Sequence, residues 1–76
     1  METKTLFVAN LPPDLHPDDL YDQFRPYGAL DARIIEDKGI AFVEVPVDRL
    51  QEAIDDKHDS ELFGYRLRVN EARPRE

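Results

Sequence analysis

Hydrophobic and polar residues alternate with a period of two in four short stretches of the chain, which predicts β-strands with one covered face. These stretches are residues 5–9, 30–36, 39–45 and 65–70. Between them, two segments carry apolar residues at helical spacing, as Leu20, Phe24 and Tyr27 do. The pattern predicts the order β-α-β-β-α-β, an α+β ferredoxin-like fold with a four-stranded antiparallel sheet and two helices on one face.

Proline and glycine residues predict the ends of the helices. Pro17 is followed by two aspartates, and proline in the first turn with acids beside it is typical of a helix start. Gly28 is expected to end this helix. Pro46 is expected to open the second helix, whose inward side chains would be Val47, Leu50, Ala53 and Ile54.

If both helices pack on one face of the sheet, the other face stays open. The alternation places ten side chains there: Phe7, Ala9, Arg33, Ile35, Ile40, Phe42, Glu44, Arg66, Arg68 and Asn70. Two phenylalanines on an open face have a purpose if nucleobases stack on them, since each stacked base contributes about 1 to 3 kcal/mol. Phe24 and Phe63 do not fall on this face and are expected in the core.

Two segments resemble the sequence motifs of the RNA recognition motif family. Residues 6–11, LFVANL, are similar to its hexapeptide, and residues 38–45, KGIAFVEV, to its octapeptide. The resemblance extends over essentially the whole chain, and residues 69–76 are similar to the ending of small single-domain bacterial and organellar members. It implies a single domain over residues 1–76, with a core from about 4 to 72 and a short basic C-terminal tail.

The resemblance implies non-catalytic binding of single-stranded RNA on the open sheet face. Phe7 and Phe42 would be the stacking platforms, and Lys38 would contact phosphate. The other expected contacts are Ile40, Arg33, Arg68, Asn70 and Arg73. Ile40 stands where the family's octapeptide has an aromatic residue, so one of three platforms is missing and we expect modest affinity.

A net charge of −7 opposes binding to phosphate, so its distribution matters. Residues 14–27 carry a net charge of −3 and residues 46–61 carry −4, which accounts for the whole excess. A helix is about 10 to 12 Å across, and the Debye length is about 8 Å at physiological salt. We therefore expect the acidic helices to leave RNA binding on the opposite face intact.

The composition restricts other chemistry. The absence of cysteine removes disulfides, thiolate metal sites and thiol nucleophiles, and two histidines make a poor metal site. No nucleophile is paired with a base and no glycine-rich phosphate loop occurs, so we expect no enzyme activity, cofactor or metal. No apolar run approaches the roughly 20 residues that span a bilayer. We expect an intracellular monomer without a membrane partner; the sequence does not distinguish nucleus from cytoplasm.

Two alternatives stay open. The chain could be a protein-interaction module of the same fold, in which the acidic helices or an apolar patch at Ile35 and Ile40 bind a peptide or a second domain. It could also be a redesigned or excised domain kept for its fold.

Overall fold

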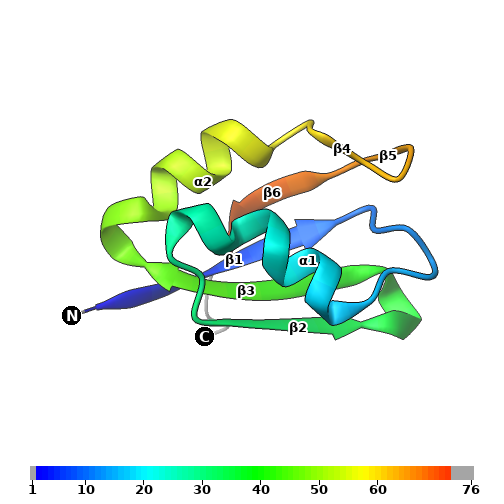
Figure 1. The fold of residues 1–76 in the computed structure, drawn as a ribbon, viewed down its shortest axis with the longest axis horizontal. Coiled ribbons are helices and arrows are strands. Elements are labelled where there is room, and N and C mark those ends of the chain that lie inside the picture. The colour runs from blue at the N-terminus through cyan, green and yellow to red at the C-terminus, as the bar shows by residue number, and fades with distance from the viewer. Residues whose placement is uncertain (1, 73–76) are drawn as a thin grey trace.

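A four-stranded antiparallel sheet forms the centre of the computed structural model, which describes residues 2–72 (Figure 1). Its strands lie in the order β2-β3-β1-β6. They are β1 (Thr3–Ala9), β2 (Asp31–Ile35), β3 (Ile40–Pro46) and β6 (Arg68–Glu71). The helix α1 (Pro17–Phe24) crosses in front of β1 and β3 in Figure 1, and α2 (Leu50–Lys57) runs alongside β6; both helices contribute residues to one core. The predicted α+β ferredoxin-like fold is confirmed.

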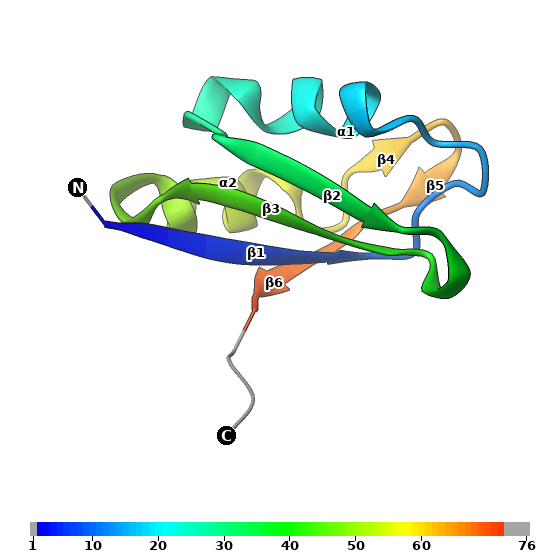
Figure 2. The ribbon, with the colours of Figure 1, turned by 90° about the horizontal axis from the view of Figure 1, so that it is seen from below.

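The face of the sheet opposite the helices is open. Figure 2 shows the sheet close to edge-on, with α1 on one side and no other element of residues 2–72 on the opposite side. Three short 3₁₀ helices connect the main elements: η1 (Arg25–Tyr27), η2 (Glu36–Lys38) and η3 (Val47–Arg49). None of them covers the open face.

The first helix begins and ends where the sequence predicts. Pro17 is its first residue, and the Nδ1 atom of His16 accepts a hydrogen bond of 3.1 Å from the backbone N of Asp18. After η1, Gly28 adopts a φ of 78° and ends the helical segment. A Cβ atom at Gly28 would lie 3.3 Å from Cγ of Pro46. Both the backbone angle and the close approach therefore favour glycine there.

The second helix begins later than predicted. Pro46 ends β3 instead of opening the helix, and η3 separates it from Leu50. The backbone N of Val47 donates a hydrogen bond of 3.0 Å to the carbonyl of Glu2, so the strand pairing continues past the proline. The inward side chains are the predicted ones: Leu50 and Ala53 are buried, and Val47 and Ile54 are partly buried.

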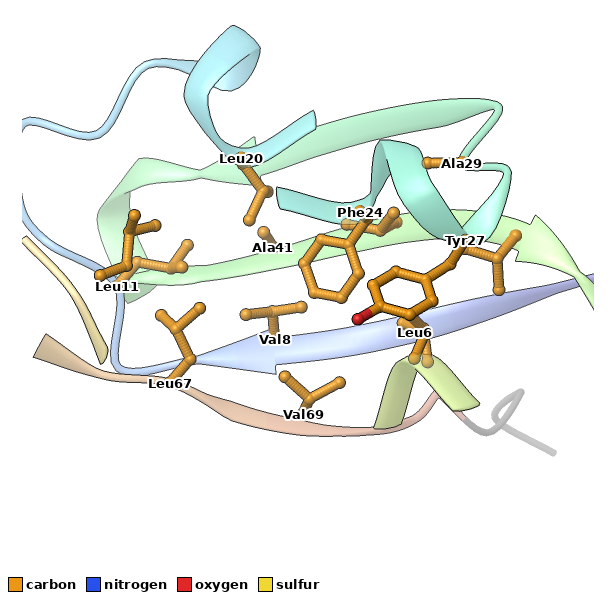
Figure 3. Close-up of a cluster of buried hydrophobic side chains, with 14 of the residues drawn as sticks. Leu6, Val8, Leu11, Leu20, Phe24, Tyr27, Ala29, Ala41, Leu67 and Val69 are labelled. Atoms are coloured by element: carbon orange, nitrogen blue, oxygen red, sulfur yellow. The ribbon is translucent and has the colours of Figure 1, made fainter. Parts of the chain in front are cut away.

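The hydrophobic core fills the space between the sheet and the two helices (Figure 3). Leu6 and Val8 of β1 and Val69 of β6 are fully buried in it. Phe24 of α1 packs against Tyr27 of η1, with ring centroids 6.4 Å apart. The prediction that Phe24 belongs to the core is confirmed.

The prediction that Phe63 also belongs to the core is wrong. Its side chain is 66% exposed, at the tip of a hairpin formed by β4 (Glu61–Leu62) and β5 (Tyr65–Arg66). Leu62, one position earlier, is the residue that points inward. The apolar segment thus contributes a leucine to the core and leaves the larger ring in solvent.

The predicted last strand, residues 65–70, is divided at Leu67. The backbone N of Leu67 donates a hydrogen bond of 2.7 Å to the carbonyl of Ser60, and the backbone N of Asp59 donates one of 2.8 Å to the carbonyl of Leu67. Leu67 therefore pairs with the segment after α2, and only β6 joins the main sheet. Arg66, expected on the open face, lies instead in the β4–β5 hairpin.

Candidate nucleic-acid interface

The register between strands arranges the open face in three rows that run across the sheet. The middle row consists of Arg33, Phe42, Phe7 and Asn70. A flanking apolar and basic row consists of Ile35, Ile40, Ala9 and Arg68. The acidic row on the other flank consists of Asp31, Glu44 and Thr5.

Two aromatic rings occupy the centre of the face. Phe7 and Phe42 are direct cross-strand partners, and their ring centroids lie 5.8 Å apart with a tilt of 53°. This geometry is a favourable aromatic pair. Both side chains are partly buried although no element of residues 2–72 covers them, so their exposed ring surface is available to a ligand.

A hollow with basic side chains lies beside the apolar and basic row. Its volume is about 560 Å³, and its lining residues are Ala9, Asn10, Leu11, Lys38, Gly39 and Arg68. Lys38 reaches it from the turn between β2 and β3, and Arg68 from the start of β6. The two exposed cations therefore meet at one end of the face.

Hydrogen bonds from the loop after β1 join the segments that line this hollow. Asn10 adopts a φ of 63°, and its Nδ2 donates a hydrogen bond of 2.7 Å to the carbonyl of Arg66. The backbone N of Leu11 donates one of 3.2 Å to the carbonyl of Gly39. The loop is thus tied both to the chain that leads into β6 and to the turn that carries Lys38.

A second, smaller hollow of about 280 Å³ lies at the opposite end of the face. Its lining residues are Thr5, Asp31, Arg33, Phe42 and Glu44. The hydroxyl of Thr3 donates a hydrogen bond of 2.6 Å to Oε2 of Glu44. The open face is therefore chemically asymmetric, with Lys38 and Arg68 at one end and two carboxylates beside Arg33 at the other.

The cations of the face are available to an anionic ligand. Arg33, Lys38 and Arg68 are exposed, and the ion pairs found among the described residues involve other side chains. The shortest dimension of the molecule is 20 Å, and Figure 1 is viewed along it, through the helices toward the sheet. This thickness exceeds the Debye length of about 8 Å, so the outer charges of α1 and α2 are largely screened at the open face.

The structure places most of the predicted site residues together. Phe7, Phe42, Ile40, Arg33, Arg68 and Asn70 stand on the open face, and Lys38 stands at its end. Arg73 lies outside the described residues. Whether any of these side chains contacts RNA stays a prediction.

Seven of the residues that line the two hollows are outside the predicted contact set: Thr5, Ala9, Asn10, Leu11, Asp31, Gly39 and Glu44. Thr5 and Asp31 share the alternation phase of Phe7 and Arg33, so the period of two could have placed them on the face. Asn10 belongs to the segment that resembles the hexapeptide; its tolerance of a positive φ is the signal that could have placed it beside the basic hollow.

The family model of the RNA recognition motif matches residues 6–68 of this chain, which contain both resembling segments, the whole of β2 and β3, part of β1 and the first residue of β6. The chain belongs to the RNA recognition motif family. It is thus an RNA-binding domain, as its resemblance implied.

Solved RNA recognition motifs and related RNA-binding domains have the same fold. The RNA-binding protein PG1 is similar with a TM-score of 0.86 and 31% identity, over 96% of this chain and 98% of that chain. The second RNA recognition motif of the yeast poly(U)-binding protein Pub1 matches with a TM-score of 0.85 and 27% identity, over 96% and 98% of the two chains. The RNA-binding domain of Nop6 from S. cerevisiae matches with a TM-score of 0.78 and 26% identity, over 95% and 96%.

Two features of the described residues bear on other kinds of site. No helix in this part of the chain is long and apolar enough to cross a membrane. Among the side chains that the structure describes, no group of three or more histidine, cysteine, aspartate or glutamate residues could hold a metal ion.

Proposed function

We propose that this RNA recognition motif binds single-stranded RNA by stacking bases on Phe7 and Phe42, without catalysing a reaction. The observation that carries the proposal is the position of these rings. They lie 5.8 Å apart in the middle row of a face that no other element of residues 2–72 covers. Only unpaired bases offer a free ring surface to such platforms, so the preferred ligand is a single strand.

The surroundings of the rings supply the remaining interactions. Arg33 and Asn70 continue the row of the rings, and Lys38 and Arg68 line the basic hollow. These side chains are suited to hydrogen-bonding with phosphate groups and with the edges of bases. Ile40 offers apolar contact but no aromatic stacking, and Arg73 would add a cation from the tail.

The affinity that follows is modest. Two platforms contribute about 1 to 3 kcal/mol each, and Ile40 contributes no stacking. Compared with a domain that has three aromatic platforms, the loss of one raises the dissociation constant by roughly one to two powers of ten. We propose a monomeric, intracellular domain with its core at about residues 4–72; a protein partner on the helices is the competing hypothesis.

The deciding experiment replaces both platforms. The Phe7→Leu/Phe42→Leu variant keeps apolar bulk on the face and removes the planar rings, so we expect its affinity for short single-stranded RNA to fall by about 30-fold or more. Binding is measured by fluorescence anisotropy and by residue-resolved NMR titration, in which the wild type shifts signals of the sheet. The Phe63→Ala variant is the matched control, because it removes an exposed aromatic ring outside the sheet.

The outcomes separate the two hypotheses. Weakened binding in the leucine variant, with Phe63→Ala unchanged, supports stacking on the sheet. Unchanged RNA affinity in a folded leucine variant would contradict it. An absence of NMR shifts on the sheet would favour the protein-interaction hypothesis instead.

A further inference from the structure

The two carboxylates on the open face have no role in binding phosphate. Asp31 and Glu44 are cross-strand partners, and Glu44 also faces Thr5. Carboxylates repel a phosphate backbone, so this end of the face is the least favourable place for one. What carboxylates bind well is an N–H group, and nucleobases carry such groups on their edges.

The carboxylate of Glu44 is held in place. The hydroxyl of Thr3 donates to its Oε2 atom at 2.6 Å, and its Oε1 atom has no hydrogen-bond partner among the described residues. A charge-assisted hydrogen bond of this kind orients the group and leaves the other oxygen to accept from a ligand. Asp31, on the neighbouring strand, is exposed and makes none of the ion pairs found among residues 2–72.

A donor stands beside these acceptors. Arg33 is two residues from Asp31 on the same face of β2, and it faces Phe42 across the strand pair. All of these side chains line the hollow of about 280 Å³. No ion pair within 4.0 Å joins Arg33 to either carboxylate in the described part of the chain, so the hollow offers a cationic donor and anionic acceptors at once.

The spacing of the strand brings a base edge to these groups. Phe42 and Glu44 are two residues apart on β3, which corresponds to about 7 Å along a strand. A base stacked on the ring of Phe42 extends several ångströms beyond its point of contact. Its edge therefore comes within hydrogen-bond reach of Glu44, Asp31 and Arg33.

The four bases differ in what they offer this hollow. Guanine presents two adjacent donors, N1–H and N2–H₂, which match the two oxygens of one carboxylate, and its O6 accepts from a guanidinium. Adenine and cytosine present one amino group next to a ring acceptor. Uracil presents a single N–H between two carbonyls, so a carboxylate that accepts from this N–H is repelled by the neighbouring carbonyl oxygens.

We propose that this hollow is a guanine-selective subsite for single-stranded RNA, in which Asp31 and Glu44 accept from N1–H and N2–H₂ and Arg33 donates to O6. The inference rests on the proposed stacking of a base on Phe42. Phosphates are then directed toward the opposite end of the face, where Lys38 and Arg68 line the basic hollow.

The test compares labelled RNA hexamers that differ only at their two central nucleotides, measured by fluorescence anisotropy. The wild type is expected to bind the hexamer with central guanosines about 10-fold more tightly than the all-uridine hexamer, since one bidentate base contact discriminates by about that factor. Inosine lacks the 2-amino group, so replacing guanosine with inosine removes most of the preference.

Variants assign the preference to the carboxylates. Asp31→Asn/Glu44→Gln keeps the size of both side chains and the hydrogen bond from Thr3, but leaves one acceptor oxygen on each group. Its guanosine-to-uridine preference should fall below about twofold, with uridine binding no weaker than in the wild type. Asp19→Asn/Asp22→Asn is the matched control, because it changes the charge equally on exposed positions of α1.

Each result decides the matter. Equal affinity for guanosine and uridine hexamers, with binding that still depends on the two rings, overturns the guanine subsite and leaves the proposed function intact. So does a preference that survives Asp31→Asn/Glu44→Gln. Absence of binding to every hexamer, or binding that is indifferent to Phe7→Leu/Phe42→Leu, overturns both proposals together.

Discussion

Phe24 and Phe42 are the same amino acid in two different situations. The ring of Phe24 is fully buried under the sheet, whereas that of Phe42 keeps part of its surface in water beside Phe7. Apolar surface contributes about 25 cal/mol per Å² to stability only once it leaves water. The exposed part of Phe42 therefore adds nothing to folding, and a stacked base could recover that contribution on binding.

Phe63 provides a test of backbone strain at a single residue. Phe63 and Gly64 have φ angles of 51° and 85° between the paired residues Leu62 and Tyr65, the pattern of a type I′ hairpin turn. Asparagine adopts the left-handed conformation more readily than phenylalanine does. We predict that Phe63→Asn raises the free energy of unfolding by about 1 kcal/mol, measured by urea denaturation.

Phe63→Ala serves as the control for this prediction. It removes the same ring, which is 66% exposed, but does not ease the positive φ angle. If the alanine and asparagine variants were equally stable, the backbone angle would not be the cause of any gain.

Residue-level prediction from the sequence succeeds where side-chain direction depends only on the strand itself. The period of two put Phe7, Phe42 and Arg33 on one face, and the structure agrees. The position of Phe63 depends instead on the turn type, which decides whether Leu62 or Phe63 points inward. The turn type is defined by the backbone angles of Phe63 and Gly64, and the hydrophobic pattern of the sequence does not predict them.

At the level of elements, a single hydrogen bond links η1 to α2. The hydroxyl of Tyr27 donates to Oδ2 of Asp56 at 2.9 Å. Burial raises the pKa of the Tyr27 phenol above its usual 10.0, and the bond to Asp56 and the charge of that carboxylate raise the pKa further. The folded state thus favours the protonated phenol.

This link predicts a loss of stability at alkaline pH. Because the folded pKa exceeds the unfolded one, the stabilisation is complete below about pH 10 and is lost as the pH rises through the folded pKa. Tyr27→Phe should cost about 1 kcal/mol at neutral pH and show a smaller decline than the wild type as the pH rises above about 10. Urea denaturation across this range measures both; parallel declines in the two proteins would contradict the prediction.

Prediction of the elements is limited by pairing between distant segments. Pro17 and Gly28 mark the first helix through local chemistry, and both positions are confirmed. The late start of α2 depends on the bond from Val47 to Glu2, which joins residues at one end of the β1–β3 pair that are far apart in the sequence. The rows of the open face likewise depend on register, so the meeting of Asp31 with Glu44 is visible only in the fold.

For the whole molecule, the arrangement of charge reconciles a net charge of −7 with an RNA-binding face. The acidic helices lie on one side of a molecule that is 20 Å thick, and Arg33, Lys38 and Arg68 stand on the other side or at its end. Screening over a Debye length of about 8 Å separates the two sides. The net charge is thus a poor guide to what RNA meets at the sheet.

Salt dependence measures this separation. Three available cations imply a slope of about −2 in a plot of log affinity against log salt concentration, or about a 16-fold loss between 50 and 200 mM salt. Lys38→Gln/Arg68→Gln should reduce the slope to about −1. Asp19→Asn/Asp22→Asn on α1 should leave it unchanged; a marked change there would mean that the helices influence RNA across the sheet.

The place of β2 at the edge of the sheet has a consequence for how this domain can change. Its outward positions, Asp31, Arg33 and Ile35, share no core contact with the helices, whereas Ala32 and Ile34 pack against the core. The outward set can therefore be exchanged at little cost in folding free energy. Substitutions at these three alternate positions of one edge strand would then change which nucleotide the domain prefers, while the core and the fold stay the same.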